Sequence, residues 1–254
     1  MERIAWNEQV PGHFEVDSVH HGGSMPSGDY VHTLQFIDVA TGWSERVAVL
    51  GRSQLVVEDG FRVVLQRLPF PVLEVHSDNG PEVLNAHLVR FWGDRVTGVR
   101  LSRSRPYEKN DNRFVEQKNA TLVRRYLGDL RLDTVAQTHA LNELYDRMWL
   151  FYNFFQPVMR QTAKHFVSVD GQPSRRVRRF DTPRTPFDRV CQTGVIPPKR
   201  QQMLCQLREQ TNPRRLRQDI YAQLDDLARM PGAPPGVVED VMLSLRLPAK
   251  LAHS

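Results

Sequence analysis

Apolar and polar residues alternate with a period of two in several short segments of the first hundred residues. Residues 13–20 place Phe14 and Val16 on one face and Glu15, Asp17 and Val19 on the other, which is typical of a strand with one core face. Residues 30–39 and 43–50 have the same character and are joined by a short turn. We therefore expect three antiparallel strands at the start of the chain.

A helical period follows. Ser53 is a suitable N-cap, and apolar residues then recur at helical spacing until Pro69. Further along, the pattern predicts strands at 71–76 and 96–101 and helices at 82–92, 111–127 and 134–155. Strands in hairpins followed by alternating strands and helices indicate an α/β fold with a mixed five-stranded sheet flanked by helices.

The character of the chain changes near residue 170, where Arg, Pro, Gln and Thr become frequent. We predict a main domain at residues 1–170 and a basic, partly helical C-terminal extension at residues 171–254. Residues 204–230 can form an amphipathic helix that Pro213 breaks or restarts.

Charge and cysteine content narrow the class of protein. The chain has 34 Lys and Arg against 29 Asp and Glu and a net charge of +5, which suits a polyanionic partner. It has two cysteines, no His and Cys spacing typical of zinc sites, no signal peptide and no apolar stretch of about 20 residues. We expect a cytoplasmic, nucleoid-associated protein with no membrane contact and no zinc.

Three carboxylates stand in settings that suit phosphodiester chemistry. Asp17 lies on the first strand, Asp78 follows the fourth strand in a Ser-Asp-Asn-Gly turn, and Glu116 lies on a helix. Two divalent metal ions about 3.5–4 Å apart can activate an oxygen nucleophile and stabilise the leaving oxygen, and Mg²⁺ prefers carboxylate ligands. At about 100° per residue, Glu116 falls at the rim of the buried stripe of its helix, with Arg113 and Arg124 on the exposed side.

Each acid also has a structural interpretation. Asp78 alone is most simply a turn residue, and Glu116 alone is most simply a solvated helix carboxylate. Local pattern does not separate Asp17 from Glu15, because both lie on the same strand face. His76 is more simply a packing residue than a metal ligand.

The blocks around these acids resemble a known family. Phe14-Glu-Val-Asp17, His76-Ser-Asp-Asn-Gly-Pro-Glu82 and Arg105-Pro-Tyr-Glu-Lys-Asn-Asp-Asn-Arg-Phe-Val-Glu-Gln-Lys-Asn119 are similar to the three catalytic blocks of the retroviral-type integrase core, in its bacterial insertion-sequence transposase branch. The resemblance extends through Asn153-Phe-Phe-Gln-Pro157 and Phe180-Asp-Thr-Pro-Arg-Thr-Pro186, and so covers about residues 6–190.

The resemblance implies an RNase H-like fold and a DDE polynucleotidyl transferase that cuts and joins DNA strands in transposition or integration. It implies that Asp17 bridges two Mg²⁺ (or Mn²⁺) ions and that Asp78 and Glu116 each bind one. It also implies a homo-multimer acting on DNA. The residues that we expect to contact DNA are polar or basic: Asn79, Lys109, Asn112, Arg113, Asn119, Arg124, Arg175, Arg176, Arg178 and Arg179.

This sequence departs from the family's pattern in two places. Phe114 stands two residues before the glutamate, where related transposases usually have His or another polar residue. About ten residues precede the first strand, without the helix-turn-helix that we expect to recognise transposon ends, which favours a fragment. Two alternatives therefore stay open: an idle transposase remnant that only binds nucleic acid, and a nuclease of the same fold.

Overall fold

The computed structural model describes residues 4–5, 7–24, 27–77, 86–87, 89–93, 96, 98–104, 112–167 and 175–246, without the side chains of residues 164–167 and 175–176. Of the predicted site residues, Asp78, Asn79 and Lys109 lie outside this part of the chain. None of the helices within it is long and apolar enough to cross a membrane.

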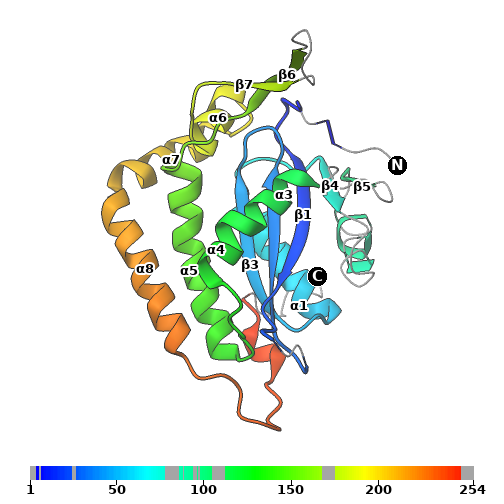
Figure 1. Ribbon diagram of the computed structural model, residues 1–254, viewed down its shortest axis with the longest axis vertical. Coiled ribbons are helices and arrows are strands. Elements are labelled where there is room, and N and C mark those ends of the chain that lie inside the picture. Colours follow the sequence, from blue (N-terminus) through cyan, green and yellow to red (C-terminus); the bar gives the residue numbers. More distant parts are fainter. Residues whose placement is uncertain are drawn as a thin grey trace.

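A mixed sheet of five strands forms the centre of the molecule (Figure 1). Its order is β3-β2-β1-β4-β5, for strands β1 (His13–His20), β2 (Val31–Asp38), β3 (Ser44–Leu50), β4 (Glu74–Ser77) and β5 (Arg100–Arg103). β1, β2 and β3 pair antiparallel, whereas β4 is parallel to both β1 and β5. This order and these directions confirm the predicted α/β class with a mixed, RNase H-like sheet flanked by helices.

The fifth strand differs from its prediction. The sequence predicts a strand at 96–101, but β5 begins at Arg100, which pairs with Glu74. Gly98 just before it has a φ of +81°, a left-handed conformation that turns the backbone and that glycine adopts without strain. The prediction was wrong by several residues because the apolar pattern continues through this turn.

Helix α1 (Gln54–Arg67) covers one face of the sheet. Its residues Val56, Val57, Phe61 and Val64 join Phe14 and Val16 in one buried cluster. Gly60 allows the close approach, since a Cβ there would stand 2.9 Å from Leu34 Cδ1. Pro69 follows directly after the Leu68 C-cap, as the sequence predicts.

The other face is covered by two helical segments. The first consists of α3 (Arg113–Lys118), the π-helical stretch η2 (Asn119–Arg124) and α4 (Arg125–Leu127). The second is α5 (Val135–Phe154), which Thr134 and Gln137 begin with a capping box. Val19 of β1 lies in a second buried cluster with Val123, Leu127 and residues of α5.

α5 also satisfies the free edge of the sheet. Asn142 bonds both the N–H and the carbonyl of Ala48, and Asn153 does the same for Ser44. β3 is an edge strand, whose unpaired backbone groups would otherwise be buried without partners.

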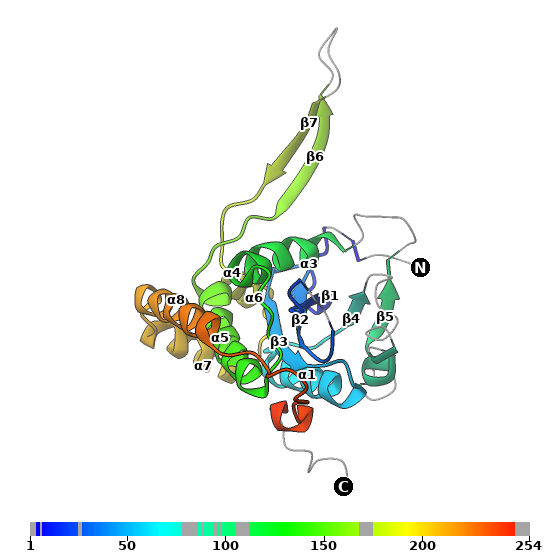
Figure 2. The same ribbon diagram turned by 60° about the horizontal axis from the view of Figure 1, so that its bottom comes forward.

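Between β4 and β5 the structure has the π-helical turn η1 (Val89–Gly93). After α5 come a hairpin of β6 (Gln161–Val167) and β7 (Arg175–Phe180), then α6 (Pro186–Thr193), α7 (Pro198–Gln210), α8 (Pro213–Arg229) and the 3₁₀ turn η3 (Val241–Ser244). The hairpin projects from the body of the molecule (Figure 2), and the sequence analysis did not predict it. Pro213 restarts the helix, at the first position of α8 after the Asn212 cap. α8 lies along α5 (Figure 1) and buries Leu216, Ile220 and Leu227 in the second cluster.

Candidate functional site

The parallel pair β1 and β4 positions the first predicted acid. Val16 pairs with Ser77, the last described residue of β4, so Asp17 lies one residue beyond the end of the described pairing. Asp17 is half-buried. Its Oδ1 accepts a hydrogen bond from the Ser18 N–H at 2.7 Å, and its Oδ2 accepts one from the side-chain amide of Asn119 at 2.6 Å. The carboxylate therefore stands in a fixed orientation at the surface of the sheet.

The α3 helix brings the third predicted acid to the same strand. Glu116 is exposed on α3, and Asn119 follows it by three residues. Residues three apart on a helix are neighbours on its surface. Because Asn119 bonds Asp17, the turn of helix that carries Glu116 stands over the strand that carries Asp17.

Two further residues fix this helix on β1. Asn112, its buried N-cap residue, donates from Nδ2 to the Val16 carbonyl at 3.4 Å. Glu15 Oε2 accepts the backbone N–H groups of Phe114 at 2.7 Å and Val115 at 2.9 Å. Burial raises the pKa of Glu15 to about 7, against the opposing effect of these two hydrogen bonds.

This contact separates two residues that the sequence pattern leaves equivalent. Glu15 is 2% exposed, and its Oε2 accepts two backbone N–H groups in the first turn of α3, as expected of a structural residue. Asp17, two residues later on the same face, is half-buried and reaches the surface. The geometry favours Asp17 as the reactive carboxylate.

Of the three acids predicted as metal ligands, Asp78 lies outside the described residues. Among the residues described, no three His, Cys, Asp or Glu side chains come together in a way that could hold a metal ion. Asp17 and Glu116 are among these described residues, and Asp78 is not. His76, which neighbours the predicted acids in sequence, is fully buried and bonds Ser102 and Ser104, as a packing histidine does.

The predicted DNA-contacting residues fall into two groups. Asn112, Arg113, Asn119 and Arg124 lie on or next to the helical segment that carries Glu116. Arg175, Arg176, Arg178 and Arg179 lie on β7, where Arg178 and Arg179 are exposed and the side chains of the other two are not described. Arg113 and Arg178 meet at one cavity, so the structure connects the two groups.

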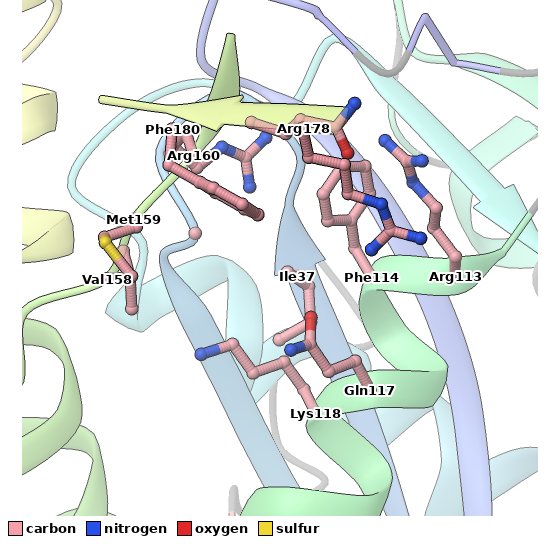
Figure 3. A pocket seen from close by; sticks show the side chains of 12 residues that line it. Ile37, Arg113, Phe114, Gln117, Lys118, Val158, Met159, Arg160, Arg178 and Phe180 are labelled. Carbon is pink, nitrogen blue, oxygen red and sulfur yellow. The ribbon is translucent and has the colours of Figure 1, made fainter. Parts of the chain in front are cut away.

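That cavity has a volume of about 570 Å³ and lies between α3, the end of β2 and the base of the β6–β7 hairpin (Figure 3). Phe114 lies between two guanidinium groups, with Arg113 Cζ 4.7 Å and Arg160 Cζ 4.5 Å from its ring centre. Lys118 points into the same space (Figure 3). Arg160 and the contact of Phe114 with two guanidinium groups could not be predicted from the sequence, because no local pattern connects residue 160 to residue 114.

Burial lowers the pKa values of two cations at this cavity, Lys118 and Arg160. The pKa of Lys118 is lowered to about 8, first by burial and then by Arg46 and Arg160. The pKa of Arg160 is lowered to about 10, mainly by burial. An anion bound in this cavity would therefore stabilise the charged forms of Lys118 and Arg160.

Comparisons with known proteins show a relative that aligns with part of this chain. No family model matches the chain. The chain is 38% identical over 184 residues to the uncharacterized protein y4rM of Sinorhizobium fredii (strain NBRC 101917 / NGR234), an alignment covering 72% of this chain and 51% of that protein. The chain thus spans about half the length of this relative.

Among solved structures, the fold is similar to two retroviral integrase catalytic cores. The catalytic core domain of BIV integrase aligns with a TM-score of 0.40 at 15% identity, over 72% of this chain and 95% of that one. The HTLV-2 integrase catalytic core domain in complex with magnesium aligns with a TM-score of 0.41 at 17% identity, over 59% of this chain and 91% of that one. Neither likeness assigns a role to a residue of this chain.

Proposed function

We propose that this chain is the catalytic core of a Mg²⁺-dependent DDE transposase or integrase that cuts and joins DNA strands, with Asp17, Asp78 and Glu116 as its metal-binding acids. The observation that carries the proposal is the hydrogen bond from Asn119 to Asp17, which brings the helix of Glu116 onto the strand of Asp17. β4 ends beside this point at Ser77, and the next residue in the sequence is Asp78.

Two of the proposed ligands, Asp17 and Glu116, have the chemistry that suits magnesium. Asp17 and Glu116 offer carboxylate oxygens from a strand and a helix in contact, and both reach solvent. Mg²⁺ prefers oxygen ligands and is usually bound by one or two carboxylates together with waters and substrate phosphates. Bound there, the ions supply an activated oxygen nucleophile and stabilise the leaving oxygen of the phosphodiester.

The chain's own residues position these acids. Asn119 holds one oxygen of Asp17, so that the carboxylate keeps its orientation while its other contacts change. Glu15 and Asn112 anchor the first turn of α3 to β1, which fixes the height of Glu116 above the strand. Basic side chains on α3, η2 and β7 bind the phosphates of DNA.

We also propose that the chain acts as a homo-multimer on DNA and that residues 171–254 serve as a basic extension of a core formed by residues 1–170. The exposed Arg178 and Arg179 on β7 support a role for this extension in DNA binding. The proposed boundary at residue 170 lies outside the described residues.

A strand-transfer assay tests the proposal. Labelled duplex DNA from both borders of the genomic segment that encodes the chain is incubated with Mg²⁺ or Mn²⁺ and the wild type, Asp17→Asn, Asp78→Asn or Glu116→Gln. We expect joined products with the wild type and a loss of at least about 100-fold in each variant. Glu143→Gln, an exposed carboxylate change on α5, is the matched control and should keep the wild-type rate.

Two outcomes would contradict the proposal. Cleavage without joining indicates a nuclease of the same fold. DNA binding without metal-dependent chemistry indicates a protein that only binds nucleic acid.

A further inference from the structure

The cavity beneath the β6–β7 hairpin is lined by cations and by no described carboxylate. Of its twelve lining residues, the charged ones are Arg113, Lys118, Arg160 and Arg178, and all four are positive. Ion pairs elsewhere in the structure match Arg with Asp or Glu, as in Arg67 with Glu45 and Arg189 with Asp181. Lys118 and the guanidinium of Arg160 have no such ion pair with a described residue.

A further cation lies close to Lys118. Arg46 on β3 is 1% exposed, and its three guanidinium nitrogens have no hydrogen-bond partner among the described residues. It stands over the rings of Tyr145 and Tyr152, 5.6 and 5.5 Å from their centres. Arg46 and Arg160 both repel the charge of Lys118. Asp38 and Glu15 partly offset the charge of Arg160, and Glu45 partly offsets that of Arg46. Lys118 has no ion pair with a described residue, so a bound anion would stabilise the charge of Lys118 most.

A second cavity continues from the first. It has a volume of about 650 Å³ and shares Gln117, Lys118 and Val158 with the cavity of Figure 3. Beyond Lys118 it is lined by cationic and aromatic side chains from the helical segment, α5 and α8: Arg125, Tyr126, Tyr152, Arg217 and Tyr221. One carboxylate, Asp225 on α8, also lines this cavity, against the three cations Lys118, Arg125 and Arg217. The two cavities form one groove with Lys118 at its middle, and we call it the Lys118 groove.

Aromatic surface lies on both sides of Lys118. Phe180, at the hairpin end, is 50% exposed, and Tyr221, at the α8 end, is 46% exposed. Arg217 stands 5.8 Å from the ring centre of Tyr221. Cations that follow a phosphate backbone, with aromatic rings on which unpaired bases stack, are the features by which proteins bind single strands.

The geometry points to the Lys118 groove as a binding site for a single strand of nucleic acid, with a backbone phosphate at Lys118 and Arg160 and bases on the exposed rings. Gln117, which lines both cavities, directly follows Glu116 on α3, so the strand passes near this proposed acid. The claim that this strand is the substrate's path rests on the proposed function. The claim that the groove binds a single strand is tested without any metal-dependent chemistry.

The test is binding of a fluorescent oligothymidylate of about 12 nucleotides, a length within the range of known single-strand sites. Affinity is measured in EDTA over a series of salt concentrations, for the wild type and for Lys118→Met. We expect Lys118→Met to bind the oligonucleotide about 10-fold more weakly than the wild type. The slope of log affinity against log salt should fall by about 0.7, the value for one phosphate contact on a single strand.

Two controls separate this result from misfolding. Met keeps the length of Lys and removes a charge that the free protein leaves unpaired, so the melting temperature of Lys118→Met should equal or exceed that of the wild type. Lys199→Met, an exposed change on α7 that lines neither cavity, should bind like the wild type. Arg178→Ala, an exposed change on the hairpin, gives a second measurement and should also weaken binding.

Wild-type affinity and slope in both Lys118→Met and Arg178→Ala would overturn the inference. So would equal competition by duplex DNA or by heparin, which would show a site for any polyanion. A protein that binds the oligonucleotide through Lys118 but joins no DNA strands would contradict the proposed function and leave this inference standing.

Discussion

The side-chain amide of Asn119 donates to Oδ2 of Asp17 at 2.6 Å and thereby ties the helix of one predicted acid to the strand of another. A residue that orients a metal ligand typically affects metal affinity or activity by 10- to 100-fold. We therefore predict that Asn119→Ala raises the half-saturating Mg²⁺ concentration of strand transfer at least about 10-fold.

A purely structural role for Asn119 would lower the amount of active protein and leave the Mg²⁺ dependence unchanged. The Mg²⁺ titration distinguishes the two roles. Asn7→Ala removes an exposed asparagine side chain outside the site and serves as the matched control. A normal Mg²⁺ titration for Asn119→Ala would mean that Asp17 does not need this hydrogen bond.

Substitution of Glu15 should lower stability, whereas substitution of Asp17 should lower activity. Glu15→Ala leaves the buried N–H groups of Phe114 and Val115 without their acceptor, at a cost of about 1–3 kcal/mol for each unsatisfied group. We predict a clearly lower midpoint of denaturant unfolding. Asp17→Asn should keep that midpoint close to the wild-type value and abolish strand transfer.

The comparison is made by urea unfolding of both variants and the wild type with the same optical signal. If Asp17→Asn unfolded as easily as Glu15→Ala, the two carboxylates would share a structural role. The preference for Asp17 as the reactive acid would then lose its physical basis.

Much of the fold could be predicted from the sequence because its apolar periods are regular. β1 has the predicted bounds, α1 begins beside its predicted cap and ends beside its predicted stop, and α5 lies within the predicted range 134–155. The stripe on the helix of Glu116 also agrees, since Val115, Asn119, Leu122 and Val123 are all buried and Glu116 is exposed. In these segments the apolar period of the sequence matches the face of the strand or helix that is buried.

The parts that the sequence did not predict depend on long-range contacts. The β6–β7 hairpin has an Arg-rich second strand without an apolar face, and its strands are defined by backbone pairing. The cavity beside Phe114 needs Arg160, 46 residues away in the chain. Periodicity carries no information on which distant cations share a cavity, so the Lys118 groove could only be found in the structure.

A histidine cluster should make the stability depend on pH. Burial, followed by the neighbouring His20 and basic groups, lowers the pKa of His21 to about 4 and that of His32 to about 3. The usual value is 6.5, so the unfolded chain binds more protons than the native protein below that pH. The contribution of these two histidines to stability is fully present above about pH 6.5 and is lost progressively as the pH falls towards 4. Glu15, whose pKa is raised by burial, contributes in the opposite direction.

Thermal melts between pH 4.5 and 7.5 check this prediction. His21→Gln removes one titrating group and can keep a hydrogen bond to Thr33, so its melting temperature should fall less steeply with decreasing pH. His139→Gln, an exposed histidine on α5 with no place in the cluster, is the control and should follow the wild-type curve. Parallel curves for His21→Gln and the wild type would assign the acid sensitivity to other groups.

The cap of α5 provides a stability test away from the acids. The Thr134 side chain accepts the Gln137 N–H at 3.1 Å, and Gln137 Oε1 accepts the Thr134 N–H in return. Loss of such a cap costs about 1 kcal/mol. Thr134→Ala should therefore lower the melting temperature by about 2–4 °C in a protein of this size. Thr134→Ser keeps the hydroxyl and should melt like the wild type, whereas equal melting of both variants would mean that the cap contributes no stability.

Asn153 of α5 bonds the backbone of Ser44, the first residue of the edge strand β3. Asn153 accepts the Ser44 N–H at 2.9 Å and donates to the Ser44 carbonyl at 3.0 Å, and its side chain is fully buried. Asn153→Ala leaves two buried backbone groups unsatisfied, each at about 1–3 kcal/mol, so a loss of about 2–6 kcal/mol in the free energy of unfolding is expected. Gln202→Ala, an exposed amide change on α7, is the control and should be neutral. A loss below about 1 kcal/mol in urea unfolding would show that water reaches Ser44 once the amide is removed, and that α5 does not seal this edge of the sheet.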